Sequence, residues 1–267
     1  MGKRLVVIGC GNMGSAVVRG LLKVKWTTAS HIVASHPKRE RAAAIGKALG
    51  IDCLTSNLKA IEGADVILLG VKPQILPEVL AELRGAVSTK SLVLSMAAGV
   101  KTRTIELALP GVPVVRSMPN LAATVGLGAT AIAPGAHANK AHVALARQVF
   151  EAVGVVEEVP EKLMDAVTGL SGTGPMYVFH FVEAMADAGV KVGLSRDVAS
   201  RLALQTLIGS AHLARDSHLH AAALKDQVTS PGGTAIAALH VLRREGFQAI
   251  VMDAVEAATR RAAELGQ

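Results

Sequence analysis

The sequence predicts an α/β protein in two parts, a mostly parallel sheet with covering helices followed by an all-helical domain. Between residues 4 and 159, short apolar runs alternate with longer helical patterns, which is typical of successive βαβ units. After Pro160 the strand-like runs stop, and the chain becomes rich in alanine with apolar residues at helical spacing. We therefore place a boundary near Glu161 and predict two domains, residues 1–160 and 161–267. The apolar runs of the first domain are LVVI, HIVA, DVILLGV, SLVLSMA, PVVRS and GATAIA.

The helical domain carries two apolar stripes that about one hundred residues can hardly bury alone. We expect these stripes to pack against a second copy, which makes the protein a homodimer or a larger ring built from dimers. The alternative is that the helical part docks on its own N-terminal domain. The stripes consist of Val178, Phe181, Val182 and Met185, and of Phe247, Ile250, Val251, Ala254, Val255 and Ala258.

Composition and charge exclude several classes of function. The 267 residues are 51% hydrophobic, enough for a substantial core. A net charge of +7 could indicate nucleic-acid binding, but only 2% of residues are aromatic and the basic residues are scattered. We predict no nucleic-acid partner, because an acidic small-molecule substrate and a phosphate-rich cofactor explain the charge more simply. The apolar stretches Val66–Val71 and Ser91–Val100 are shorter than the roughly 18 to 20 residues of a membrane helix, so we expect no membrane association.

The N-terminus and the two cysteines favour a cytoplasmic protein. The opening MGKRLVVIGCGNMG has charges before an apolar run, but the run is too short for a secretion signal and is interrupted by glycines. Cys10 and Cys53 form no CxxC pair and no metal-ligand spacing with histidine. This use of cysteine fits a reducing compartment and argues against a metal site.

A GxGxxG motif follows the first predicted strand and opens the first predicted helix. In this context Gly9 makes the tight turn, Gly11 lets the backbone approach a pyrophosphate, and Gly14 allows close packing of helix on strand. The helix N-terminus offers free N–H groups to the phosphates, so the motif predicts a Rossmann dinucleotide-binding domain. The alternative is a glycine-rich turn without a ligand. The predicted contact residues are Ile8, Gly9, Cys10, Gly11, Asn12, Met13 and Gly14.

The end of the second predicted strand favours NADPH over NADH. NAD enzymes usually place an acidic residue here for the ribose 2′-hydroxyl, but this chain reads Ser35-His36-Pro37-Lys38-Arg39. A hydroxyl and nearby cations can accept a 2′-phosphate, which an acid would repel. We predict NADPH as the cofactor, with NADH as a second candidate. The alternative for Lys38 and Arg39 is that they begin a solvated helix.

Two further segments lie at the carboxyl ends of predicted strands, where Rossmann loops face the cofactor. They are Gly70-Val71-Lys72-Pro73 and Ser95-Met96-Ala97-Ala98-Gly99. Their small residues permit approach of the backbone to a ligand. Ordinary packing at a strand end is the alternative for Ala97 and Ala98.

Two segments of the second half place proline and glycine near the start of a helix, GLSGTGPMYVF and VTSPGGTAIAAL. A helix N-terminus preceded by hydroxyl residues can bind a carboxylate, because several unpaired N–H groups converge on it. Helix capping alone is the alternative.

Six strings carry a resemblance to a known family: IGCGNMGSA, GVKPQ, RSMPN, DAVTGLSGTGPMYVF, GVKVGLSRDVA and LKDQVTSPGGTAIAALHVLRREGF. In this order, and over nearly the whole chain, they resemble the pyrroline-5-carboxylate reductases. The resemblance implies reduction of L-1-pyrroline-5-carboxylate to L-proline with NAD(P)H, the last step of proline biosynthesis. It also implies a Rossmann domain followed by a helical dimerisation domain of the 6-phosphogluconate dehydrogenase C-terminal type, in homodimers or a homodecamer.

The resemblance further implies roles for individual positions. The dinucleotide would be lined by Gly9 to Gly14, Ser35, Asn57, Gly70, Val71, Lys72, Pro73, Ala97 and Gln227. The substrate would lie near Glu161, Ser230, Gly232, Gly233, Thr234 and Ala235, and the catalytic candidates are Ser171, Thr173 and Thr234. On this view backbone N–H groups of Ser230 to Thr234 grip the substrate carboxylate, while a hydroxyl or water near Ser171 serves the ring nitrogen.

The chain departs from the family at one position. The family commonly has threonine two residues after the second glycine, and the resemblance implies that its hydroxyl would hydrogen-bond the ring nitrogen. Here that position holds Ala235, and Thr234 points roughly 100° away on a helix.

Three other functions stay open at this point. A β-hydroxyacid dehydrogenase has the same domain order but uses a catalytic lysine where this chain has SGTGPMYVF. A reductase of a six-membered cyclic imine is a stronger alternative than the dehydrogenase, because the sequence does not decide the ring size of the substrate. A regulatory protein that binds NADPH without chemistry is the third.

Overall fold

The computed structural model describes residues 2–266. The chain divides into two compact units, residues 1–173 with 257–267 and residues 174–256. The first predicted domain ends thirteen residues before this division, and its boundary at residue 160 stays a prediction.

An eight-stranded sheet forms the larger unit, in the order β3-β2-β1-β4-β5-β6-β7-β8. Every neighbouring pair is parallel except β6 and β7, which are antiparallel. The link between these two strands is too short for the crossover that parallel strands need, whereas β7 and β8 are joined through a helix and run parallel. The strands are β1 (Leu5–Ile8), β2 (Ile32–Ser35), β3 (Asp52–Leu54), β4 (Val66–Leu69), β5 (Leu92–Ser95), β6 (Val114–Met118), β7 (Gly128–Pro134) and β8 (Gly154–Glu158).

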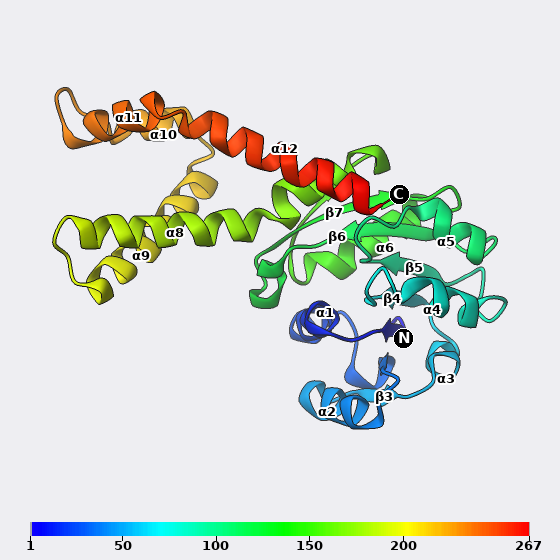
Figure 1. Ribbon diagram of the computed structural model, residues 1–267. Coiled ribbons are helices and arrows are strands. Elements are labelled where there is room, and N and C mark those ends of the chain that lie inside the picture. The colour runs from blue at the N-terminus through cyan, green and yellow to red at the C-terminus, as the bar shows by residue number, and fades with distance from the viewer. Residues whose placement is uncertain (1, 267) are drawn as a thin grey trace. The chain divides into compact units, whose positions relative to one another are not determined.

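Helices cover both faces of this sheet (Figure 1). Leu5 and Val7 of β1 enter one buried cluster, and Val6 and Ile8 enter another, because alternate side chains of a strand point to opposite faces. The α-helices of this unit are α1 (Asn12–Lys23), α2 (Arg39–Leu49), α3 (Asn57–Ile61), α4 (Leu76–Leu83), α5 (Thr102–Ala108), α6 (Lys140–Glu151) and α7 (Met164–Val167). Short 3-10 turns span Ala29–His31, Leu121–Val125 and Glu161–Leu163.

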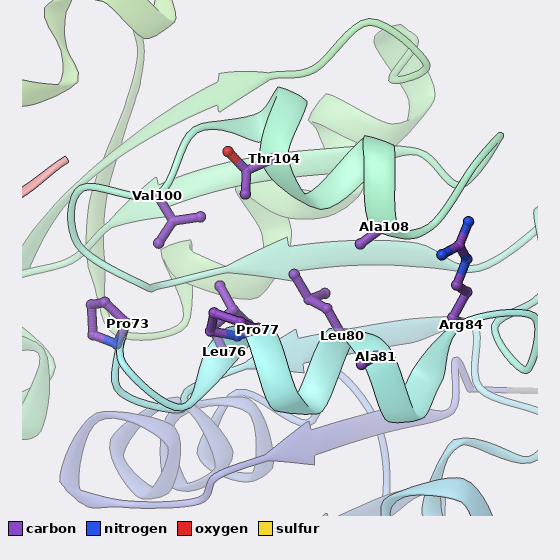
Figure 2. A pocket seen from close by; sticks show the side chains of 9 residues that line it. All are labelled: Pro73, Leu76, Pro77, Leu80, Ala81, Arg84, Val100, Thr104 and Ala108. Atoms are coloured by element: carbon purple, nitrogen blue, oxygen red, sulfur yellow. The ribbon is translucent and has the colours of Figure 1, made fainter. Parts of the chain in front are cut away.

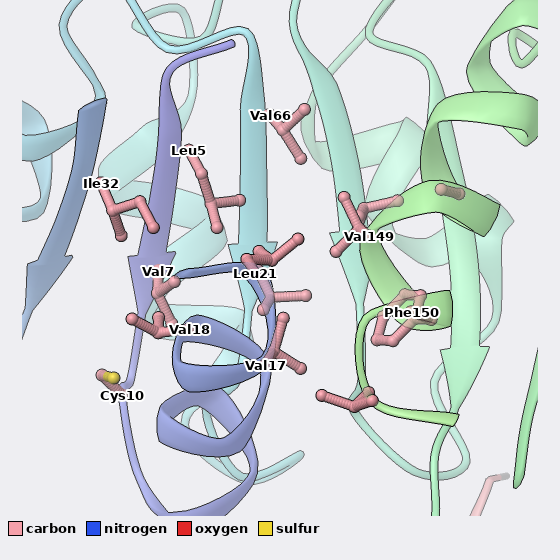
Figure 3. Packing of buried hydrophobic residues seen from close by; sticks show 14 of the residues in the cluster. Leu5, Val7, Cys10, Val17, Val18, Leu21, Ile32, Val66, Val149 and Phe150 are labelled. Carbon is pink, nitrogen blue, oxygen red and sulfur yellow. The ribbon is translucent and has the colours of Figure 1, made fainter. Parts of the chain in front are cut away.

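The first cluster packs α1 and α6 against the sheet (Figure 3). Val17, Val18 and Leu21 of α1 are fully buried, as are Val149 and Phe150 of α6. Each such side chain contributes about 1.5 to 3 kcal/mol by leaving water. This packing fixes α1 against the sheet.

Two strands were absent from the sequence prediction. β3 has three residues and none of them is buried, while β8 buries only Val156 among its five. Both lie at the edges of the sheet, where one face of a strand meets solvent and no apolar run is required.

The smaller unit is entirely helical, as predicted. It holds α8 (Gly174–Lys191), α9 (Arg196–Ser217), α10 (Ala221–Gln227), α11 (Thr234–Arg244) and the first part of α12 (Phe247–Leu265). Its buried side chains in α8 and α9 are alanines only, namely Ala186, Ala199 and Ala203. Many of the large apolar side chains are exposed on the chain taken alone, while Val182, Met185 and Leu207 are half-buried. Among the described residues, no helix has the length and apolar character needed to span a membrane.

The segment before α8 differs from the expectation. A π-helical turn, Thr168–Gly172, precedes α8, and the Thr173 amide donates to the Thr168 carbonyl at 2.8 Å. Pro175 does lie in the first turn of α8, but the residues ahead of it are already helical. The helix therefore does not open from a loop as expected, and the preceding turn already uses the Thr173 amide.

Candidate active site

The glycine-rich turn has the geometry that a dinucleotide requires. Gly9 has φ +78°, and a Cβ there would lie 2.5 Å from Val71 Cγ1. A Cβ on Gly14 would come within 3.0 Å of Val7 Cγ1, whereas one on Gly11 would meet nothing within 4 Å. Gly11 is also the N-cap of α1, with no side chain capping the helix. The turn thus leaves open space and uncapped N–H groups at one end of α1, which fits a pyrophosphate.

Cys10 lies behind this turn rather than in it. The side chain is buried in the α1 cluster, where Figure 3 shows it beside Val7 and Val18. Its Sγ is 3.6 Å from Ser15 Oγ, and burial raises the pKa of the thiol. Burial, with a smaller effect of Cys10, also raises the pKa of Cys53 to about 11. Neither thiol is poised as a nucleophile, and any contact of Cys10 with cofactor would be through its backbone.

A chain of three polar side chains ends at the last residue of β2. The Ser35 hydroxyl donates to Asn57 Oδ1 at 2.7 Å, and Asn57 Nδ2 donates to Glu82 Oε2 at 2.6 Å. Ser35 is only 1% exposed, Asn57 begins α3, and Glu82 is an exposed residue of α4. Sequence reasoning named Ser35 and Asn57 but missed Glu82, which no motif marks.

The loop after β4 meets the glycine-rich turn, and the loop after β5 meets the end of β4. The Gly70 amide donates to the Ile8 carbonyl at 2.8 Å, and a Cβ on Gly70 would lie 2.8 Å from the Gly9 carbonyl oxygen. The Met96 amide donates to the Leu69 carbonyl at 3.0 Å. Lys72 is exposed, whereas Ala97 is 2% exposed and part of the core. Ala97 therefore serves packing at the strand end, whatever its backbone contacts.

An apolar hollow of about 520 Å³ lies between α4 and α5 (Figure 2). Pro73 and Val100 lie toward one end, and Arg84 toward the other. None of the residues of the glycine-rich turn lines it. Within residues 2–266, Pro73 is the one predicted dinucleotide contact that also lines the hollow.

The candidates of the π-helical turn make internal hydrogen bonds. The Ser171 hydroxyl donates to the Val167 carbonyl at 3.2 Å, and the Thr173 hydroxyl donates to the Thr168 carbonyl at 2.9 Å. Asn120, after β6, donates to the Ser171 carbonyl at 3.1 Å and accepts from the Ala129 amide at 3.1 Å. The hydroxyl oxygens of Ser171 and Thr173 can therefore still accept a hydrogen bond, whereas their protons are already donated to backbone carbonyls.

Glu161 is held by its own unit. Its carboxylate accepts two hydrogen bonds from Thr102 and lies 3.7 Å from Arg116 Nη1. Arg116 is 4% exposed and also lies 3.6 Å from Asp165. This geometry favours a positioning role for Glu161 over direct binding of a substrate.

The remaining candidates lie in the smaller unit. Gly232 has φ +67°, the Gly233 amide donates to the Ser230 carbonyl at 3.1 Å, and a Cβ on Gly233 would lie 2.2 Å from Ser230 Oγ. Gly233 is the N-cap of α11, with no side chain capping it. Thr234 is exposed, Ala235 is half-buried, and Gln227 is an exposed residue at the end of α10. The turn therefore offers uncapped N–H groups beside a glycine in the left-handed region.

Known proteins resemble the chain over its whole length. A pyrroline-5-carboxylate reductase of Synechocystis is 44% identical over 267 residues, covering 100% of both chains. One of Methanosarcina acetivorans is 44% identical over 266 residues, covering 99% of this chain and 98% of the relative. The chain belongs to the pyrroline-5-carboxylate reductase family.

Solved structures and family models agree with this membership. The reductase of Coxiella burnetii superimposes with a TM-score of 0.95 at 33% identity, covering 100% of both chains. The Plasmodium falciparum enzyme, solved with NADP bound, gives 0.87 at 30% identity, covering 99% of this chain and 98% of that one. Residues 161–265 match the model for pyrroline-5-carboxylate reductase dimerisation, and residues 4–99 match that for NADP oxidoreductase, coenzyme F420-dependent.

Family membership confirms the predicted fold class, a Rossmann domain followed by a helical dimerisation domain. It also supports a homo-oligomer and an NADP-type cofactor. The β-hydroxyacid dehydrogenase alternative is set aside, because the match to the reductases covers the helical part as well as the sheet.

Proposed function

We propose that this reductase converts L-1-pyrroline-5-carboxylate to L-proline with NADPH, the final step of proline biosynthesis. One observation carries the proposal, the 44% identity to a pyrroline-5-carboxylate reductase across the entire chain. The open glycine-rich turn supports it independently, because that turn fits a pyrophosphate.

The cofactor residues in the proposal are those at the carboxyl ends of β1, β2, β4 and β5. Backbone N–H groups of Gly11 to Gly14 would hold the pyrophosphate, and Ser35 with Asn57 would face the adenosine ribose. Val71 to Pro73 and the backbone at Ala97 would border the nicotinamide half. Gln227 is proposed to approach the cofactor from the helical part. When bound, NADPH supplies the hydride, and NADH is a second donor.

The substrate carboxylate is assigned to the turn from Ser230 to Ala235. Uncapped N–H groups at the start of α11 suit a carboxylate, and the helix dipole adds to their attraction. Thr234 is exposed at this turn and can add a hydroxyl contact. Gly232 and Gly233 leave this stretch of backbone without side chains. A side chain at Gly233 is also excluded by packing, because its Cβ would collide with Ser230.

The hydroxyls of Ser171 and Thr173 suit a protonated imine. Each gives its proton to a backbone carbonyl, so each oxygen can accept a hydrogen bond but not easily supply a proton. An iminium nitrogen carries the N–H that such an oxygen accepts. The iminium ion is already activated, so the residues contribute orientation and charge stabilisation, and solvent protonates the amine that forms.

The exposed apolar face of the smaller unit is proposed to form the dimer contact. Met176, Val178, Phe181, Phe247, Ile250 and Val251 border one hollow on this face. The rings of Phe181 and Phe247 are 6.2 Å apart. Assembly as a dimer, or as a decamer of five dimers, would cover this surface. A cytoplasmic location is part of the same proposal, supported by the two free cysteines.

The test is NADPH oxidation by purified protein with racemic pyrroline-5-carboxylate, followed by identification of the product. A six-membered imine carboxylate and NADH serve as parallel reactions. Turnover to proline, faster than with the six-membered ring, is the expected result. Faster turnover of the six-membered imine would assign the enzyme to that substrate instead. Tight NADPH binding without turnover of either imine would favour the regulatory alternative.

A further inference from the structure

An acidic side chain on a helix distant in the sequence is linked to the end of β2 through Asn57. The loop after β2 itself has no acid, and its Lys38 and Arg39 favour a 2′-phosphate. Glu82, on α4, accepts a hydrogen bond from Asn57 at 2.6 Å, and Asn57 in turn accepts the Ser35 hydroxyl at 2.7 Å. A carboxylate is thus linked through two hydrogen bonds to the residue that closes β2.

The direction of this chain follows from the chemistry of its end group. An ionised carboxylate only accepts hydrogen bonds, so Asn57 must turn its Nδ2 group toward Glu82. Asn57 Oδ1 then faces Ser35, and the single proton of the Ser35 hydroxyl is used in this bond. The hydrogen bond to Asn57, at 2.7 Å, thus fixes the direction of the Ser35 hydroxyl.

This arrangement decides whether the end of β2 presents a hydrogen-bond donor or only an acceptor to the adenosine ribose. Rossmann domains place the adenosine ribose here, with either a 2′-hydroxyl or a 2′-phosphate. A phosphate needs donors, but Ser35 presents lone pairs only. A 2′-hydroxyl can donate to those lone pairs. Glu82 thereby opposes the effect of Lys38 and Arg39.

We propose that Glu82 is a specificity-determining positioning residue that restrains the preference for NADPH. It fixes the orientation of the Asn57 amide, and Asn57 Oδ1 then accepts the proton of the Ser35 hydroxyl. The inference rests on the proposed use of this turn for a dinucleotide. Without Glu82, the Asn57 amide is free to turn its Nδ2 group toward Ser35, and the Ser35 hydroxyl is then free to donate to a 2′-phosphate.

The test compares binding of NADP⁺ and NAD⁺ to Glu82→Ala and to the parent protein by titration calorimetry, with no imine present. Replacing Glu82 should raise NADP⁺ affinity by roughly two- to tenfold, the worth of one regained hydrogen bond, and leave NAD⁺ affinity nearly unchanged. Glu78→Ala is the matched control, because Glu78 is also an exposed acid of α4 and makes the same change in charge. The control should change the NADP⁺-to-NAD⁺ ratio much less.

A second variant tests the route through Ser35. In a Ser35→Ala background, Glu82→Ala should shift the ratio of NADP⁺ to NAD⁺ affinity no more than Glu78→Ala does. No Ser35 hydroxyl is then left that could donate to a 2′-phosphate. An equal shift in Glu82→Ala and Glu78→Ala, or no shift in either, would overturn the proposal. Failure of the parent protein to bind either dinucleotide would instead overturn the proposed function.

Discussion

Both carboxylate oxygens of Glu161 accept hydrogen bonds from Thr102. Oε1 accepts the Thr102 amide at 2.7 Å, and Oε2 accepts its hydroxyl at 2.8 Å. Thr102 begins α5, whose N-cap residue Lys101 supplies no side-chain cap. Glu161 therefore caps α5 from outside the helix. Since α5 follows directly on the loop at Ala97, this contact ties the position of that loop to residue 161.

Glu161→Ala should destabilise the fold. The change uncaps α5 and removes one of two carboxylates beside the buried Arg116. We expect a loss of about 2 to 3 kcal/mol in the free energy of unfolding, from the lost cap and the weakened ion pair. Urea unfolding at matched protein concentration measures it. Glu157→Ala, at an exposed position of β8, is the control and should cost much less. A stable Glu161→Ala protein with weakened substrate binding alone would instead support direct contact with the substrate.

Gly11→Ala should weaken cofactor binding without harming the fold. An added Cβ meets no protein atom within 4 Å, so the space it fills is the space proposed for the pyrophosphate. NADP⁺ affinity should fall by about tenfold or more, since backbone approach is lost. Calorimetry gives the affinity, and thermal unfolding without ligand should be unchanged. Unaltered affinity would mean that the pyrophosphate does not pass over Gly11.

Ile250→Glu should dissociate the oligomer. Ile250 is 62% exposed on the single chain and borders the apolar hollow with Phe181 and Phe247. Burying an unpaired carboxylate in a subunit contact costs several kcal/mol, so monomers should replace dimers. Light scattering after size exclusion measures the mass. Gln248→Glu is the control, because that residue does not border the hollow. A dimer that survives Ile250→Glu would place the contact on another face.

Ala235→Thr should strengthen binding of the imine. The family commonly has a threonine at this position, whose hydroxyl is thought to bond the ring nitrogen, and Ala235 is half-buried beside the uncapped start of α11. One restored hydrogen bond should lower KM by roughly two- to tenfold. Steady-state kinetics with pyrroline-5-carboxylate measures the change, and Ala237→Thr on the same helix is the control. An unchanged KM would show that another group already serves the nitrogen.

Much of the fold follows from patterns that are local in the sequence. The apolar runs mark the buried central strands, because a parallel strand covered on both faces must be apolar throughout. The glycine motif predicted a tight turn at Gly9, open space for a ligand at Gly11 and close packing of helix on strand at Gly14. Each of the three glycines has the matching surroundings. The run GATAIA predicted a strand at β7, but its reversed direction was not predicted, because direction depends on the length of a link rather than on a pattern.

The contacts that refine the site could not be predicted in this way. Glu82 meets Asn57, and Glu161 meets Thr102, only because the sheet brings distant segments together. No periodicity or motif joins such residues. The π-helical turn at Thr168–Gly172 was also hidden, since its glycines and hydroxyls equally suit a loop that caps a helix.

The most direct test of the account is to follow the hydride itself. Purified protein would be given pyrroline-5-carboxylate and NADPH carrying deuterium at the transferable position of nicotinamide C4, and the product analysed by mass spectrometry and NMR. The account predicts L-proline with one deuterium on Cδ, the former imine carbon. Absence of proline, or proline without deuterium at that carbon, would contradict it.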